Sequence, residues 1–130
     1  MNCGHGTVER ESRQEGRLKA FKMSLRFIYV TCENRSEALK IAKKVITDRL
    51  AACGNILGDT TSVYRWNDEI QVEQEVVLIL KTRSELVEQL IAAINTLHSY
   101  ECPCVVSLPI EDGNKTFLDW IARETQCEII

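Results

Sequence analysis

A histidine, a phenol and a carboxylate stand close together late in the chain. His98, Tyr100 and Glu101 lie in the segment LHSYECPCVVSLP, where a helical pattern gives way to a strand pattern. Loops that rigid elements hold in place commonly carry function. These three groups can ligate a metal ion or transfer protons. The alternative interpretation is structural, because a histidine at the C-terminal end of a helix suits the helix dipole.

The thiols are a second source of reactive groups, since the chain of 130 residues contains six cysteines. Cys32 ends an apolar run and Cys53 follows a helix-like stretch, so both are interpreted first as small hydrophobic core residues. Cys102 and Cys104 flank one proline and offer two soft ligands. Their spacing is shorter than that of structural zinc sites, and no second pair lies nearby.

An even cysteine count suggests a disulfide framework in a short secreted chain. Two features oppose that interpretation here. Residues 1–23 contain no apolar core of the kind found in signal peptides, and the rest of the chain has long apolar segments that can fold without covalent links. We therefore expect reduced thiols and a cytoplasmic location.

Composition limits the class of protein further. The chain carries 16 basic and 19 acidic residues, a formal net charge of −3, which argues against a nucleic-acid binder. No apolar run reaches the roughly 18 residues of a membrane-spanning helix, so we expect no membrane partner. The length suits one domain. We expect that domain over residues 24–130, with residues 1–23 as a disordered N-terminal extension.

Hydrophobic periodicity predicts the elements that position these groups. Runs rich in β-branched and aromatic residues predict strands over residues 25–32, 60–66, 70–81 and 104–110. Apolar residues at helical spacing predict helices through residues 38–50 and 87–97. A short final helix follows, with Phe117, Leu118 and Ile121 predicted to point inward.

Turn and cap residues mark where these elements begin and end. Asn34 and Glu37 have the spacing of a capping box at the start of the first helix, and Gly54 is expected to stop that helix. Thr82 and Ser84 are candidate caps for the second helix. Residues 67–68, Asn-Asp, predict a hairpin turn between the second and third strands.

The predicted order is β-α-β-β-α-β with an extra C-terminal helix, which is the ferredoxin-like α+β pattern. Its two main helices cover one face of an antiparallel sheet. The first strand nevertheless has apolar residues on both faces, with Phe27 and Tyr29 on one side and Ile28 and Val30 on the other. Each large side chain left in water forgoes roughly 1.5–3 kcal/mol, so we expect self-association to cover the second face. The long hairpin also offers strand edges to another subunit.

Six segments in register, running from about residue 27 to residue 122, resemble the CutA family of divalent-cation tolerance proteins. They are VTCEN, LAACGNI, TSVYRWNDEI, EVVLILKT, LHSYECP and LPIEDGNKTFLDWI. The resemblance implies a ferredoxin-like fold and a tight homotrimer similar in architecture to the PII signalling proteins. It also implies a cytoplasmic copper-binding protein that responds to divalent metal ions. From the residues themselves we expect no enzyme, because no Cys–His pair has an orienting third group.

The resemblance also implies metal ligands. The family's ligands are a cysteine that ends the first strand, which matches Cys32, and a histidine pair that closes the second helix. The second histidine matches His98, whereas the first position is Leu97. A thiolate and an imidazole suit copper or zinc. Glu101, with Tyr100 beside it, is the hypothesised further ligand because it lies close to His98 in the sequence.

Several positions depart from the family pattern. Ser99 stands where the family has a proline, and Asp68 stands at the usual glycine of the hairpin turn. Asn67, which precedes it, tolerates the left-handed conformation, so the turn can form. Cys102 and Cys104 replace an apolar residue and a glutamate, and they are either additional soft ligands or packing residues.

Three other functions are weighed against metal binding. A PII-like sensor would bind a small anionic ligand between subunits, with charge from Lys81, Lys115 and Arg65, but the chain has no phosphate loop ending in GK[ST]. A trimeric scaffold without metal function is the second. A thiol enzyme is the third, and it lacks a Cys–His pair with an orienting third group.

Overall fold

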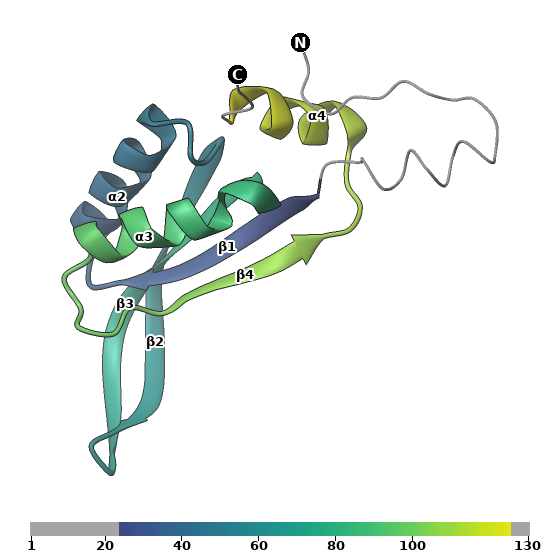
Figure 1. The fold of residues 1–130 in the computed structure, drawn as a ribbon. Coiled ribbons are helices and arrows are strands. Elements are labelled where there is room, and N and C mark those ends of the chain that lie inside the picture. The colour runs from purple at the N-terminus through teal and green to yellow at the C-terminus, as the bar shows by residue number, and fades with distance from the viewer. Residues whose placement is uncertain (1–23, 126–130) are drawn as a thin grey trace, which may run out of the picture.

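The structure, a computed structural model, describes residues 24–125. The expected extension over residues 1–23 lies outside the described residues. The elements, in order, are β1 (Leu25–Cys32), α2 (Arg35–Thr47), β2 (Cys53–Trp66), β3 (Glu69–Arg83), a 3₁₀ turn (Ser84–Leu86), α3 (Val87–Leu97), β4 (Val105–Ile110) and α4 (Lys115–Glu124) (Figure 1). This order confirms the ferredoxin-like α+β fold with its extra C-terminal helix.

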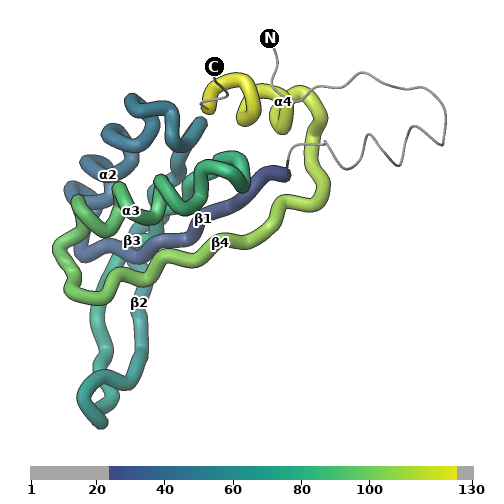
Figure 2. Tube along the Cα trace, in the orientation of Figure 1, coloured from purple at the N-terminus to yellow at the C-terminus, as the bar shows by residue number. Residues whose placement is uncertain are grey.

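The sheet is antiparallel with strand order β2-β3-β1-β4, so β1 has a partner on each side. Helices α2 and α3 lie together on one face of this sheet (Figure 2). Successive residues of a strand point to opposite faces. Ile28, Val30 and Cys32 therefore face the helices, and all three are fully buried. Their partners on the helices and on β3 complete one core, which includes Ile41, Val45, Leu78, Leu80, Leu90 and Ile94.

The start of α2 confirms half of the predicted capping box. The side chain of Asn34 accepts a hydrogen bond from the Glu37 amide at 2.9 Å. The Glu37 carboxylate accepts in turn from the amide of Glu33, at 2.9 Å, rather than from that of Asn34. Side chains thus satisfy one of the free helix amides, that of Glu37, and the amide of Glu33 just before the N-cap.

The end of α2 differs from the prediction. The helix stops at Thr47, and Arg49 follows with a φ of 60°. Leu50 is buried but lies beyond the helix. Gly54 does not end the helix either, because it belongs to β2, where an added Cβ would lie 2.9 Å from the Leu80 side chain.

The predicted caps of the second helix are wrong. Strand β3 continues to Arg83, and the Thr82 hydroxyl is buried and donates to the Leu50 carbonyl at 2.6 Å. Ser84 opens the 3₁₀ turn, and neither that turn nor α3 has a side-chain hydrogen bond at its N-cap. Helix α3 is held by its apolar face, including Leu90 and Ile94, rather than by caps.

The hairpin of β2 and β3 extends well beyond the helices (Figure 1). Asn67 and Asp68 form its turn with φ values of 52° and 64°, which confirms the predicted turn. Much of the apolar surface of this hairpin is open, and Val63, Ile70 and Val72 are 65%, 60% and 63% exposed. In the chain alone, the face of the sheet opposite the helices is only partly covered.

Helix α4 closes one end of the molecule. Ile121 is fully buried and packs in a small cluster with Leu25, whereas Leu118 is only partly buried. The prediction that Phe117 points inward is wrong, because this ring is exposed and stacks on Trp120 at 5.7 Å. Within residues 24–125, no helix has the length and apolar character needed to cross a membrane.

Candidate metal centre

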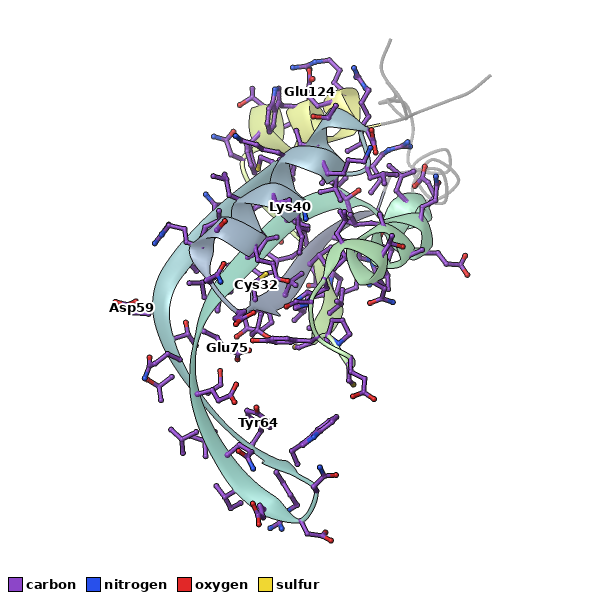
Figure 3. All side chains as sticks on the ribbon, turned by 90° about the vertical axis from the view of Figure 1, so that its left-hand side faces the viewer. Cys32, Lys40, Asp59, Tyr64, Glu75 and Glu124 are labelled. Atoms are coloured by element: carbon purple, nitrogen blue, oxygen red, sulfur yellow. The ribbon has the colours of Figure 1, made fainter. Side chains whose placement is uncertain are left out.

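Three elements bring a thiol, a carboxylate and an imidazole together where β1 ends. Cys32 is the last residue of β1, Glu37 lies in the first turn of α2, and His98 directly follows α3. One ligand atom from each side chain lies within 4.8 Å of the other two. Figure 3 shows Cys32 and Glu75 at this end of the core, where the long hairpin leaves the sheet. We call Cys32, Glu37 and His98 the donor triad.

The Cys32 thiol is fully buried against the helix layer. Burial, and after it the charges of Glu37 and Glu75, together raise the pKa of Cys32 to about 12. The thiol therefore keeps its proton at neutral pH. A metal ion that binds here has to displace that proton.

The hydrogen bonds of His98 determine which ring nitrogen can accept. The Tyr100 amide donates to Nδ1 at 3.1 Å, so Nδ1 carries a lone pair. In the neutral ring the proton is then on Nε2, which lies 2.8 Å from the Thr31 carbonyl oxygen and donates to it. Metal-binding histidines commonly donate their other N–H to a backbone carbonyl in this way. Nδ1 is thus the ligand atom, and it lies 3.7 Å from the Glu37 carboxylate.

Glu37 is held as a carboxylate by two backbone amides. One oxygen accepts from Glu33 at 2.9 Å and the other accepts from Ser99 at 2.7 Å. Partial burial raises the pKa of Glu37, but the hydrogen bonds from Glu33 and Ser99 outweigh it, so the net shift is downward. An ionised carboxylate beside Nδ1 is a ready ligand for a cation.

Tyr100 and Glu75 form a wall beside the donor triad. The rings of His98 and Tyr100 lie 4.6 Å apart between centroids. The Tyr100 hydroxyl donates to the Glu75 carboxylate at 2.6 Å, and Glu75 is only 8% exposed. Burial and the charge of Glu75 raise the pKa of Tyr100, so the phenol stays neutral. Its role here is to orient Glu75 and to cover His98.

The structure places the sequence-predicted ligands as follows. It brings Cys32 and His98 together, whereas Glu101 is exposed and does not belong to the donor triad. Glu37, which the sequence indicated only as a helix cap, takes the third place. Cys102 and Cys104 are exposed free thiols outside the triad.

Glu37 was not predicted as a ligand, because its place in the capping box already explained a glutamate at this position. One signal could have indicated Glu37 as a ligand: it lies only five residues after Cys32 in the sequence. With the helix beginning at Arg35, the first helical turn has to pass beside the end of β1. Glu75 was missed for another reason, since its position depends on the register that pairs Cys32 with Val76.

The fold and the site together define a small ferredoxin-like α+β protein with sulfur, nitrogen and oxygen donors gathered where its first strand ends. Sequence comparison is in accord with this class. The family model described as "CutA1 divalent ion tolerance protein" matches residues 26–124. The chain belongs to this family.

Individual relatives agree with that assignment. Protein CutA of Mus musculus is 40% identical over 98 residues, which are 75% of this chain and 55% of the relative. The divalent-cation tolerance protein CutA of Thermus thermophilus is 39% identical over 98 residues, 75% of this chain and 95% of the relative. The chain thus spans only about half the length of the mammalian relatives.

Solved structures give the same result. CutA1 from Oryza sativa superposes with a TM-score of 0.77 at 36% identity, covering 79% of this chain and 94% of that one. A protein described as the periplasmic divalent cation tolerance protein CutA from Archaeoglobus fulgidus gives 0.75 at 40% identity, covering 77% and 97%.

Proposed function

We propose that this chain binds copper, or a similar divalent metal ion, through the donor triad, and that this binding is its contribution to divalent-cation tolerance. One observation supports the proposal above all. Donor atoms of Cys32, Glu37 and His98, which come from three separate elements, lie within 4.8 Å of one another. The family's description points to a divalent cation as the ligand. Among divalent cations, the sulfur and nitrogen donors favour copper.

The chemistry of the three donors fits such an ion. Thiolate is a soft ligand, imidazole suits copper and zinc, and carboxylate adds a negative charge. The Thr31 carbonyl already holds the His98 ring with Nδ1 toward Glu37. On binding, a metal would replace the Cys32 proton and the Tyr100 amide that now bonds Nδ1. The chain's own work is to orient these ligands and to shield them from water.

The proposal includes a homotrimer in the cytoplasm that binds ligands rather than catalysing a reaction. The open apolar residues of the β2–β3 hairpin, together with Val106 and Leu108 on the uncovered face, support self-association. A thiol ligand has to stay reduced, which a reducing compartment provides. The threefold stoichiometry rests on the family resemblance.

Calorimetric titration with Zn²⁺, a divalent ion without redox chemistry, and with Cu²⁺ tests the proposal. We expect one ion per chain, and an affinity lowered about tenfold or more by Cys32→Ser and by His98→Gln. Cys104→Ser is the matched control, because it makes the same change at an exposed thiol. Parent-like affinity in both triad variants, with their folds intact by circular dichroism, would overturn the proposal.

The third ligand is tested by a matched pair of glutamates. We expect Glu37→Gln to weaken Zn²⁺ binding, whereas Glu101→Gln should leave it unchanged, because Glu101 is exposed and outside the donor triad. If instead Glu101→Gln weakened Zn²⁺ binding and Glu37→Gln did not, Glu101 rather than Glu37 would be the third ligand.

A further inference from the structure

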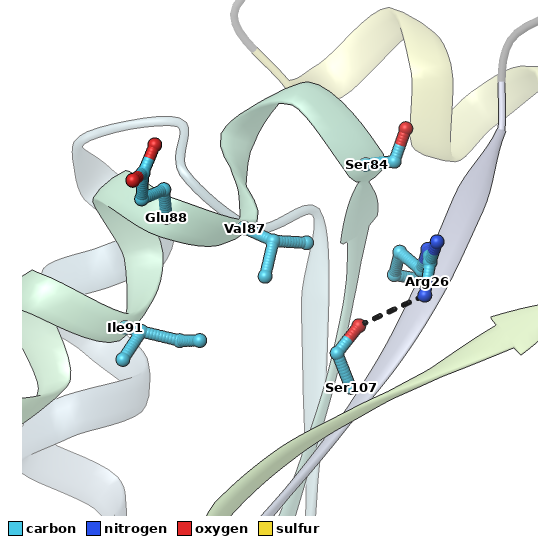
Figure 4. A pocket seen from close by; sticks show the side chains of 6 residues that line it. All are labelled: Arg26, Ser84, Val87, Glu88, Ile91 and Ser107. Carbon is cyan, nitrogen blue, oxygen red and sulfur yellow. Dashed lines mark hydrogen bonds between the residues drawn. The ribbon is translucent and has the colours of Figure 1, made fainter.

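A second, separate site is indicated by a pocket between the sheet and the start of α3. The pocket has a volume of about 400 Å³, at the lower end of the range for small-molecule sites. It is lined by Arg26 of β1, Ser107 of β4, Ser84 of the 3₁₀ turn, and Val87, Glu88 and Ile91 of α3 (Figure 4). None of these residues belongs to the donor triad.

Arg26 is the unusual member of this lining. It lies two residues before Ile28 on β1 and therefore faces the helix layer, where charged groups are rare. One terminal nitrogen donates to the Ser107 hydroxyl at 3.4 Å, which is a long hydrogen bond. The buried Nε has no hydrogen-bond partner, and no carboxylate within residues 24–125 forms an ion pair with this guanidinium.

Arg26 as a whole is only partly buried, but its Nε–H is buried and has no acceptor. A buried N–H without an acceptor costs free energy. A bound anion would supply that acceptor together with an opposite charge. A carboxylate is the best geometric match, because its two oxygens can accept from Nε and a terminal nitrogen of one guanidinium together.

The remaining lining residues define the rest of the ligand. The Ser107 hydroxyl lies beside the guanidinium, whereas the Ser84 hydroxyl points away from it, and the side chains of Val87 and Ile91 provide an apolar wall (Figure 4). Glu88 is exposed, and its carboxylate points away from Arg26. With one guanidinium, from Arg26, and one carboxylate, from Glu88, among its lining residues, the pocket suits a ligand with a single negative charge. A ligand with several phosphates would be repelled by Glu88.

We propose that this pocket binds a small monocarboxylate with a short branched apolar body, whose carboxylate pairs with Arg26 while its body contacts Val87 and Ile91. This site does not depend on the metal proposal, because the two share no residue.

The test uses the full chain and 4-methylpentanoate as the probe, followed by calorimetry. We expect saturable binding of one molecule per chain, weakened about tenfold or more by Arg26→Met. Lys40→Met is the matched control, since it removes one positive charge from the exposed side of α2, and it should bind like the parent. The neutral 4-methylpentanamide should not bind detectably.

A second variant keeps the test independent of any loss of fold. Ser107→Asp places a carboxylate beside Arg26, so it should abolish 4-methylpentanoate binding and raise the melting temperature. Arg26→Met should also melt no lower than the parent, because it removes a buried N–H that has no acceptor. Zn²⁺ binding should be unchanged in both variants, which separates this site from the donor triad.

Four outcomes would overturn the proposal. The first is parent-like binding of 4-methylpentanoate in Ser107→Asp or in folded Arg26→Met, and the second is equal binding of the amide. The third is a large loss of stability in Arg26→Met, which would identify a structural arginine. The fourth is equally tight binding of inorganic phosphate, which would identify a simple oxyanion site.

Discussion

At the scale of single residues, His98 shows how hydrogen bonds select a ligand atom. The Thr31 carbonyl accepts from Nε2 and the Tyr100 amide donates to Nδ1, so the ring has one orientation and one neutral tautomer. Glu37 is fixed as firmly by two backbone amides. The same contacts stabilise the fold, so each residue of the donor triad can be tested through stability as well as through metal binding.

Glu37 should make stability depend on pH in the acid range. Its folded-state pKa lies below the ordinary value of 4.5. Its stabilising effect is therefore fully present above that value and is lost as the pH falls through the lower folded-state pKa. We expect Glu37→Gln to cost about 1–3 kcal/mol at neutral pH, and the gap to the parent to narrow in acid. Urea unfolding at several pH values measures this gap.

The exposed Glu101 is the control for that experiment. Glu101→Gln should follow the parent's stability at every pH, because the residue is exposed. A gap between Glu37→Gln and the parent that stayed constant down to strongly acidic pH would contradict the assignment of Glu37.

Tyr100 should matter through its hydroxyl rather than its ring. Tyr100→Phe leaves the nearly buried Glu75 carboxylate without the donor that now lies 2.6 Å away. We expect a loss of about 1–3 kcal/mol in the free energy of unfolding. In the Glu75→Leu background, which has no acceptor at that position, the same change should cost much less, which a double-mutant cycle would measure. Equal costs in both backgrounds would show that this hydrogen bond is not the reason.

At the scale of elements, the hairpin turn carries measurable backbone strain. Asp68 has a φ of 64°, a conformation that glycine adopts at lower cost than other residues. We expect Asp68→Gly to raise the free energy of unfolding by up to about 1 kcal/mol, and the β-branched Asp68→Val to lower it. Thermal unfolding measures both. Glu69→Gly, one residue later in β3, should destabilise, and a stabilising effect there would contradict a turn-specific explanation.

The elements also show what could be predicted from the sequence. Strand β1 has the predicted bounds because it is a continuous run of eight residues in which Arg26 and Thr31 alone break the two otherwise apolar or aromatic faces. Strand β2 begins at Cys53, earlier than predicted, because its Gly- and Asn-containing first part pairs with the strongly apolar β3. Tertiary pairing overrides local strand preference there.

The candidate site was predictable to the extent that it follows β1 and α3. Cys32 ends β1 and His98 directly follows α3, so the order of elements alone brings them near each other. The third ligand depends on how α2 begins beside β1, and the Arg26 pocket depends on how the 3₁₀ turn opens α3. Neither of these packing details has a periodic signal in the sequence.

At the scale of the whole molecule, the open apolar hairpin should decide the assembly state. We expect the parent to sediment as a trimer, and Val72→Lys, at a residue 63% exposed in the single chain, to shift it toward smaller species. Leu39→Lys is the control, because Leu39 is an exposed apolar residue on α2 in the helix layer. A monomeric parent in analytical ultracentrifugation would contradict the proposed assembly.

The donor triad is the central claim, and cobalt spectroscopy tests it most directly. Co²⁺ is a divalent ion that binds nitrogen, oxygen and sulfur donors, and a cobalt–thiolate bond absorbs in the near ultraviolet. We predict a thiolate-to-cobalt band that saturates at one ion per chain, persists in Cys104→Ser and is absent from Cys32→Ser. A titration without this band, or a band of parental intensity in Cys32→Ser, would contradict the account.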